Sequence, residues 1–276
     1  MKTDRHIDIM GIVNLTEDSY FAQSRCPDAD AALRRVEKMV CEGAGIIDIG
    51  ACSSRPGSIP VGADEEWRRL APVLKSVRRE FPDLQISVDT YWSEVVEKTY
   101  DLIGEFIVND ISAGEDDPRM LPEVGRLGLE YIAMHKRGTP STMQSMAVYD
   151  DVAAELVRYF EDFALRAQET GIKKWILDPG FGFAKTVEQN YRVLARLPEI
   201  VEPLRGASAT WQSPRILVGV SRKSMIYKPL GISPEDALSA TQAVHMAALI
   251  GGADILRVHD VKEAKQTADL YLLQFC

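Results

Sequence analysis

Short apolar runs, each ending at a polar or turn residue, recur along the whole chain. Runs of this length that are bounded by turn residues are typical of buried β-strands. One of them is Trp175-Ile176-Leu177-Asp178, which a Pro-Gly break follows at once. The predicted strands cover residues 7–13, 46–50, 86–89, 106–110, 131–134, 175–178, 216–219 and 253–257.

Segments with helical periodicity lie between these runs. In residues 64–79, Trp67, Leu70, Val73, Leu74 and Val77 recur at helical spacing, and this predicts one buried face. The predicted helices cover residues 28–40, 64–79, a turn or more around 95–96, 120–127, 152–170, 187–197, 237–250 and 261–273. Regular alternation of strands and helices predicts an α/β fold, a single (β/α)8 TIM barrel over residues 1–276, with a doubly wound sheet as the alternative.

Polar residues gather at or just beyond the carboxyl ends of the predicted strands. They are Asn14, Asp48, Asp89, Asn109, Asp110, His135 after Met134, Asp178, residues 221–224 and residues 257–259. Any one of them could merely cap a helix. In a barrel, however, the carboxyl ends of all strands share the face that carries the active site. Because a polar residue recurs at the end of each of the eight predicted strands, the pattern favours one shared polar site over separate helix caps.

The chemistry of this ring indicates a planar ligand with an anionic group. Asp89, Asn109 and Asp178 offer acceptors and an amide, which suit the NH-rich edge of a heterocycle. Gly180 and Gly182 permit close backbone approach there. The cations for a phosphate or carboxylate are Lys223, Arg257 and Arg55, and His259 adds a further donor.

Composition narrows the possible partners and the compartment. With 32 Lys and Arg against 41 Asp and Glu, the net charge is −9, so neither nucleic acid nor an anionic membrane is an expected partner. The four cysteines form no CxxC pair, which is typical of a reduced, cytoplasmic protein. The first residues lack an apolar signal core, so we expect a cytoplasmic location.

The motifs at the strand ends resemble those of the dihydropteroate synthase family. In family order they are MGIVNLTEDSY, IIDIG followed by SSRPGS, SVDTY, NDISAG, MHKRGTP, LDPGFGFAKT, VGVSRKS and GGADILRVHDV. The resemblance implies a (β/α)8 transferase of folate biosynthesis, a sulfonamide target, that works as a homodimer with Mg2+. It would condense 6-hydroxymethyl-7,8-dihydropterin diphosphate with 4-aminobenzoate and release pyrophosphate.

The resemblance also implies roles for individual residues. The pterin would lie against Asp89, Asn109, Met134, Asp178 and Lys223. The diphosphate would be held by Asn14, Arg257 and His259, with Mg2+ on Asn14. The 4-aminobenzoate would contact Arg55, Pro56, Phe183 and Ser224. The implied mechanism is a dissociative displacement of pyrophosphate, in which Asp89, Lys223 and Arg257 are catalytic.

Two loops depart from the family pattern, and two other functions remain as alternatives. Glu17, residues 20–24 and residues 51–54 differ from the usual loop sequences. A related pterin-binding barrel could instead transfer a methyl group from a methylated folate to a corrinoid protein, but it would not need the RPGS and VGVSRKS elements. A barrel that only binds or scaffolds would not need Lys223 and Arg257. We expect Lys223→Ala and Arg257→Ala to lose most activity without unfolding the chain.

Overall fold

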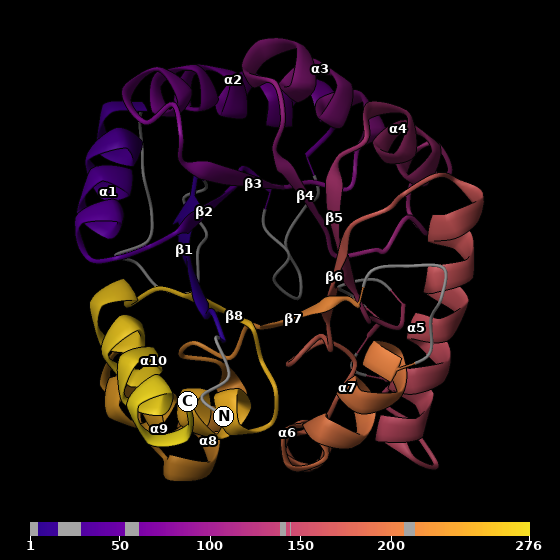
Figure 1. Cartoon of the computed structure of the whole chain (residues 1–276), viewed down its shortest axis with the longest axis vertical. Coiled ribbons are helices and arrows are strands. Elements are labelled where there is room, and N and C mark those ends of the chain that lie inside the picture. Colours follow the sequence, from indigo (N-terminus) through magenta and orange to yellow (C-terminus); the bar gives the residue numbers. More distant parts are fainter. Residues whose placement is uncertain (1–4, 16–28, 53–60, 139–141, 144, 207–212) are drawn as a thin grey trace.

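Eight parallel strands close into a barrel in the computed structural model, which describes residues 5–15, 29–52, 61–138, 142–143, 145–206 and 213–276. Each strand pairs with the next along the chain, and the last pairs with the first (Figure 1). The strands are β1 (Asp8–Asn14), β2 (Ile46–Gly50), β3 (Gln85–Asp89), β4 (Ile107–Asp110), β5 (Glu130–Met134), β6 (Trp175–Asp178), β7 (Arg215–Val218) and β8 (Ile255–Val258). The predicted (β/α)8 fold is confirmed.

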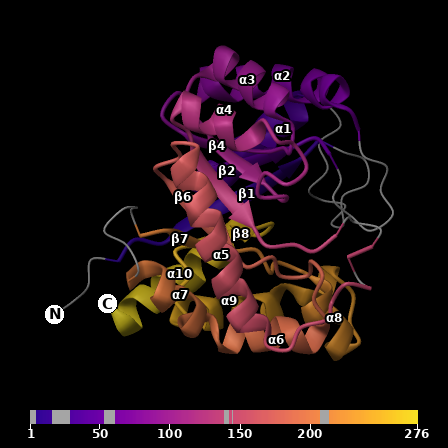
Figure 2. The ribbon, with the colours of Figure 1, turned by 90° about the vertical axis from the view of Figure 1, so that its right-hand side faces the viewer.

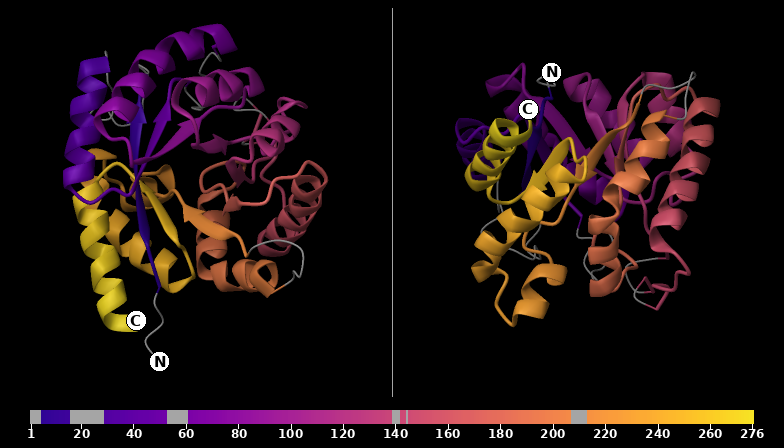
Figure 3. Two further views of the ribbon diagram at one scale, coloured as in Figure 1. Left: turned by 45° about the horizontal axis from the view of Figure 1, so that its top comes forward. Right: turned by 60° about the horizontal axis from the view of Figure 1, so that its bottom comes forward.

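Helices surround the barrel, with α1 to α4 on one side and α6 to α10 on the other (Figure 2). They are α1 (Ala29–Cys41), α2 (Ala63–Glu80), α3 (Ser93–Ile103), α4 (Met120–Leu127), α5 (Val152–Glu169), α6 (Val187–Ala195), α7 (Leu197–Gly206), α8 (Ser224–Leu230), the 3-10 helix η2 (Glu235–Ala237), α9 (Leu238–Ile250) and α10 (Val261–Phe275). The last helix, α10, packs beside β1, so the two ends of the fold meet (Figure 3). Within the described ranges, no helix combines the length and the apolar character needed to cross a lipid bilayer.

Two helices, α7 and α8, were not predicted from the sequence. The former contains Pro203, and the seven-residue α8 contains Pro229. Because proline lacks a backbone N–H and clashes with the preceding turn, it indicates a break in a sequence pattern. Both helices are accommodated on the outside of the barrel, so the strand order is unaffected.

The apolar core has two layers separated by the barrel wall. Outward-facing strand residues such as Ile47 and Val108 pack with helix residues such as Leu70 and Val96. A separate cluster fills the inside of the barrel and consists of Met10, Ile46, Ile107, Ile132, Ile176, Leu217 and Ile255. Side chains alternate between the two faces of a strand. The residues two positions further along each strand therefore point inward again, one layer closer to the carboxyl ends.

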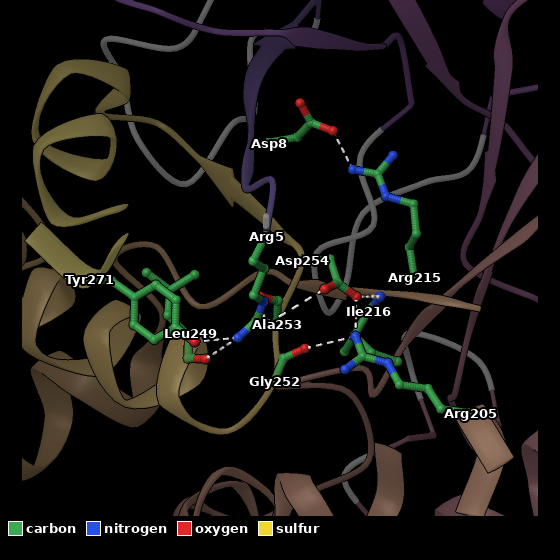
Figure 4. Close-up of polar contacts among 10 residues, drawn as sticks. All are labelled: Arg5, Asp8, Arg205, Arg215, Ile216, Leu249, Gly252, Ala253, Asp254 and Tyr271. Atoms are coloured by element: carbon green, nitrogen blue, oxygen red, sulfur yellow. Dashed lines mark hydrogen bonds and ion pairs between the residues drawn. The ribbon is translucent and has the colours of Figure 1, made fainter. Parts of the chain in front are cut away.

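Ion pairs tie the strands together at the opposite, amino-terminal end of the barrel (Figure 4). Asp254, just before β8, accepts the backbone N–H of Ile216 at 2.9 Å and pairs with Arg205 from α7. Arg5 lies 3.5 Å from Asp254 and donates to the Ala253 carbonyl at 2.7 Å. A second pair joins Asp8 of β1 to Arg215 of β7. The charges of this network are paired within the protein, whereas the other end of the barrel carries the candidate site.

Candidate active site

The layer directly above the apolar interior is mostly polar. Its members follow the inner cluster by two positions on their strands, and they are Asp48 after Ile46, Asn109 after Ile107, Met134 after Ile132, Asp178 after Ile176 and Arg257 after Ile255. Strand register places Asn109 beside Asp89 and Met134 beside Asp178. One inward-facing layer therefore brings together most of the residues to which the sequence assigned the pterin.

Asp48 is the centre of this layer and is fully buried, with none of its surface exposed. Its Oδ1 accepts the Ser87 hydroxyl at 2.7 Å. The Asn109 amide Nδ2 lies 3.2 and 3.1 Å from the two carboxylate oxygens. Arg257 closes the set, with Nε and Nη2 at 2.7 and 2.6 Å from Oδ2. A single carboxylate thus orients side chains from three other strands.

Asp89 stands next to this cluster but is more open to the barrel mouth. Its Oδ2 lies 3.2 Å from Nη2 of Arg257, and 22% of its side chain is exposed. Burial, followed by the negative charge of Asp48, raises the pKa of Asp89 to about 7, although Arg257 opposes the shift. A carboxyl with a pKa near neutrality changes its charge in the physiological range, as residues at functional sites often do.

The loop after β6 forms a second wall of the site. Asp178 accepts the Gly180 N–H at 2.8 Å, and Gly180 has a φ of 69°, which favours glycine. The Lys223 ammonium donates to the Phe181 carbonyl at 2.6 Å and lies 5.0 Å from the centre of the Phe183 ring. Burial lowers the pKa of Lys223 to about 8, and Asp178 opposes that shift. The geometry thus brings Asp178, Lys223 and Phe183 together.

A buried lysine, Lys185, supports this loop from behind. Its ammonium lies 2.9 Å from Nδ1 of His135 and donates to the Gly180 and Phe183 carbonyls at 3.1 and 3.3 Å. Burial lowers the pKa of Lys185 to about 7 and that of His135 to about 2, so the imidazole stays neutral. A neutral ring can accept a hydrogen bond, which places His135 in support of the loop.

The remaining predicted residues lie around the mouth of the barrel. Asn14 ends β1, and Ser224 begins α8. The His259 backbone N–H donates to Ser221 Oγ at 3.2 Å, and burial together with Arg257 lowers the pKa of the His259 ring to about 3. Arg55 and Pro56, as well as Glu17 and residues 20–24 and 53–54 of the unusual loops, lie outside the described residues.

Two polar residues at the strand ends point away from the site. Asp110 follows Asn109 and therefore faces the opposite side of the sheet. It accepts the Tyr131 hydroxyl at 2.6 Å and the backbone N–H groups of Ser112 and Gly114 at 2.7 and 2.9 Å, which fixes the turn after β4. Similarly, the guanidinium of Arg222 contacts both carboxylate oxygens of Asp260, at 2.7 and 3.0 Å.

The sequence pattern assigned no specific role in the site to Asp48 or Lys185, although the position of Asp48 in its strand indicated that it was unusual. In Ile46-Ile47-Asp48-Ile49-Gly50 the charge interrupts an apolar strand at the position that shares a face with Ile46. A carboxylate in the middle of a buried strand needs partners, but the pattern does not say which ones. Lys185 follows an apparent loop, where a lysine is normally exposed.

Comparison with known proteins assigns the family. The model of the family described as Pterin binding enzyme matches residues 10–259. The chain belongs to the pterin-binding enzyme family. Dihydropteroate synthase of Escherichia coli K12 is 40% identical over 260 residues, which cover 94% of this chain and 88% of that protein.

Solved structures of this family superpose on the whole barrel. The crystal structure of Yersinia pestis dihydropteroate synthase with a sulfonamide drug complex has a TM-score of 0.89 and 34% identity, covering 98% of this chain and 94% of that one. The structure of dihydropteroate synthase from Thermus thermophilus in complex with 4-aminobenzoate has a TM-score of 0.83 and 37% identity. The match covers 97% of this chain and 94% of that one. The resemblance of the motifs to the dihydropteroate synthase family is therefore confirmed, as is the predicted enzyme class, a transferase.

Proposed function

We propose that the chain condenses 6-hydroxymethyl-7,8-dihydropterin diphosphate with 4-aminobenzoate, giving 7,8-dihydropteroate and pyrophosphate. The observation that carries this proposal is the inward-facing layer of Asp48, Asn109, Asp178 and Arg257 above the apolar floor of the barrel. Relatives that align over nearly the whole chain carry the name dihydropteroate synthase. Solved structures of such enzymes include complexes with 4-aminobenzoate, with pteroic acid and with 7,8-dihydropteroate.

The pterin ring would lie in the polar layer, with Met134 as an apolar wall. Asp178 would accept from the aminopyrimidine edge, and Lys223 would donate to the carbonyl side of the ring. The short distance from Lys223 to the Phe181 carbonyl supports this, because it holds the ammonium beside Asp178 in the loop after β6. Asp89 and Asn109 would then meet the remaining ring nitrogens.

The diphosphate would lie nearer the mouth, against Asn14, Arg257 and His259. In the described part of the chain, no three His, Cys, Asp or Glu side chains are grouped to hold a metal ion. Mg2+ usually keeps several waters and binds through one or two protein oxygens together with substrate phosphates. The amide oxygen of Asn14 at the end of β1 fits that donor set. Bound there, Mg2+ would neutralise charge on the departing pyrophosphate.

The 4-aminobenzoate would enter beside Phe183 and Ser224, with Arg55 and Pro56 completing its site. In the reaction, the bond from the pterin methylene carbon to the diphosphate oxygen breaks, and its electron pair leaves with the oxygen. The electron-rich ring and the Asp89 carboxylate stabilise the cation that results. The aryl amine then forms the carbon–nitrogen bond with its lone pair and releases one proton to water. Arg257 and the N–H of the neutral His259 ring stabilise the leaving oxygen.

The decisive experiment measures pyrophosphate release from the pterin diphosphate with Mg2+, with and without 4-aminobenzoate. We expect release that depends on 4-aminobenzoate and is matched by formation of dihydropteroate. No release, with pterin binding still detected by calorimetry, would refute the synthase and leave a pterin-binding barrel. Release without any transfer to the amine would contradict the proposed acceptor.

The exposed apolar surface of α9 and α10 supports a homodimer through the outer helices. Four large apolar side chains are exposed there by 48 to 84%: Ile250, Leu270, Leu273 and Phe275. Apolar side chains gathered on neighbouring helices often mark a protein interface. Among the residues that the structure describes, Cys41, Cys52 and Cys276 form no disulfide, which supports a reducing, cytoplasmic location.

A further inference from the structure

We propose that Asp48 is a positioning residue for the reaction, which sets the hydrogen-bonding direction of Asn109 toward the pterin and the free edge of Arg257 toward the diphosphate. This inference rests on the proposed function. It concerns a carboxylate that is fully buried within the polar layer, so Asp48 would act through Asn109 and Arg257.

The orientation of the Asn109 amide follows from the charge of its partner. Nδ2 lies 3.2 and 3.1 Å from the carboxylate oxygens of Asp48. If the amide were reversed, its oxygen would face a carboxylate that pairs with Arg257, and two acceptors would repel each other. Asp48 therefore directs Oδ1 of Asn109 away from itself. Among the described residues Oδ1 has no hydrogen-bond donor, so this oxygen is presented to a ring N–H.

Asp48 also fixes the orientation of the Arg257 guanidinium, because it binds one edge of the group and leaves the other edge for a ligand. Nε and Nη2 lie within 2.7 Å of Asp48, and Nη2 is also 3.2 Å from Asp89. No acceptor in the described part of the chain contacts Nη1. The two donors of Nη1 are thus the ones left for an anion, and the planar guanidinium fixes their direction once its other edge is held.

Asp48 also acts on the charge of Asp89. Burial is the largest cause of the raised pKa of Asp89, and the negative charge of Asp48 comes next. The charged or titratable groups that act on Asp89 or lie within its electrostatic reach are Asp48 on β2, Cys52 after β2, Glu66 on α2, Asp110 on β4 and Arg257 on β8. Removing the charge of Asp48 removes its repulsion of the Asp89 carboxylate. It also leaves Asp89 as the only one of the two carboxylates that still attracts Arg257 as an anion. Both effects lower the pKa of Asp89.

Asp48→Asn is the first test, because it keeps the shape and removes the charge. We expect calorimetry to show that 6-hydroxymethylpterin and pyrophosphate each bind about 10- to 100-fold more weakly, the usual effect of losing hydrogen bonds to a charged group. The KM for 4-aminobenzoate should change by less than about threefold. The acidic limb of the profile of kcat/KM against pH should move to lower pH, a shift that loss of stability alone would not produce.

The matched control is Asp254→Asn, the same change at a partly buried carboxylate that pairs with arginine at the other end of the barrel (Figure 4). It should lower stability and leave ligand affinities and the pH profile within about twofold of the wild type. The swap Asp48→Asn with Asn109→Asp is the rescue. The new amide can donate to the new carboxylate, which again presents an oxygen to the ring, so at least about tenfold of the lost pterin affinity should return.

Three outcomes would overturn the inference: wild-type binding and pH profile in Asp48→Asn, equal losses for 4-aminobenzoate, or a swap no better than Asp48→Asn. If Asp48→Asn fails to fold, the swap, which has the same composition and net charge as the wild type, decides by its affinity for 6-hydroxymethylpterin. A wild-type protein that releases no pyrophosphate would refute the proposed function, whereas the pterin calorimetry would still test Asp48.

Discussion

Replacing Arg257 with alanine tests whether the ion pair at the base of the site also holds the barrel together. Arg257 provides the counter-charge within 2.7 Å of Asp48, whose exposed surface is 0%. Breaking a buried pair by removing one partner typically costs about 3–5 kcal/mol, because the other charge stays buried. Ser87 and Asn109 still donate to Asp48 after the change. We therefore expect the lower end, about 3 kcal/mol.

This value differs from the expectation drawn from the sequence, in which both Arg257→Ala and Lys223→Ala leave the fold intact. Lys223 donates to one carbonyl, and burial already disfavours its charged form, as its lowered pKa records. Its removal should therefore change the free energy of unfolding by less than about 1 kcal/mol. Both variants should lose most activity, but only Arg257→Ala should be clearly destabilised.

Urea unfolding followed by far-UV circular dichroism at pH 7.5 measures both free energies, provided that the slope with urea is unchanged. The double variant Arg257→Ala with Asp48→Asn should be more stable than Arg257→Ala alone, because it no longer buries an unpaired charge. The reasoning is refuted if Arg257→Ala unfolds within about 1 kcal/mol of the wild type. It is equally refuted if the second change brings no recovery.

Three further predictions concern pH and assembly. The profile of kcat/KM for the pterin diphosphate should be bell-shaped, with limbs near pH 7 from Asp89 and near pH 8 from Lys223, and Asp89→Asn should remove the acidic limb. Because the pKa of Lys185 falls from 10.5 to about 7 on folding, the unfolded chain binds more protons between these values and stability should rise with pH there. The difference between wild type and Lys185→Met should grow by up to about 1.4 kcal/mol per pH unit, and a constant difference in urea titrations would contradict this. Leu273→Lys on α10 should give a monomer by sedimentation, whereas Leu165→Lys, at another exposed apolar site on α5, should leave a dimer; an unchanged mass for Leu273→Lys would exclude this interface.

Local sequence patterns were enough to predict those strands and helices whose own residues carry a clear apolar pattern. The strands predicted over residues 46–50 and 175–178 coincide with β2 and β6, because an apolar run ended by a turn has few other stable conformations. The helices α7 and α8, which contain Pro203 and Pro229, were missed because proline breaks most helices. The helix α2 was predicted although it contains Pro72, because its long apolar periodicity outweighed the proline. The regular alternation favoured a (β/α)8 barrel but left a doubly wound sheet as the alternative, and the pairing of β8 with β1 decided between them.

The sequence by itself determined the fold class, the family and the face on which polar residues gather, because these depend on periodicity and on the order of motifs along the chain. Only the tertiary structure decided which polar residues meet. Asn109 and Asp110 are neighbours in the chain, yet the first faces Asp48 and the second faces Tyr131. Asp48 and Arg257 are 209 residues apart and form the central ion pair, because closure of β8 on β1 brings both into one inward-facing layer. Such a contact depends on register and barrel closure, which are long-range properties that no local pattern contains.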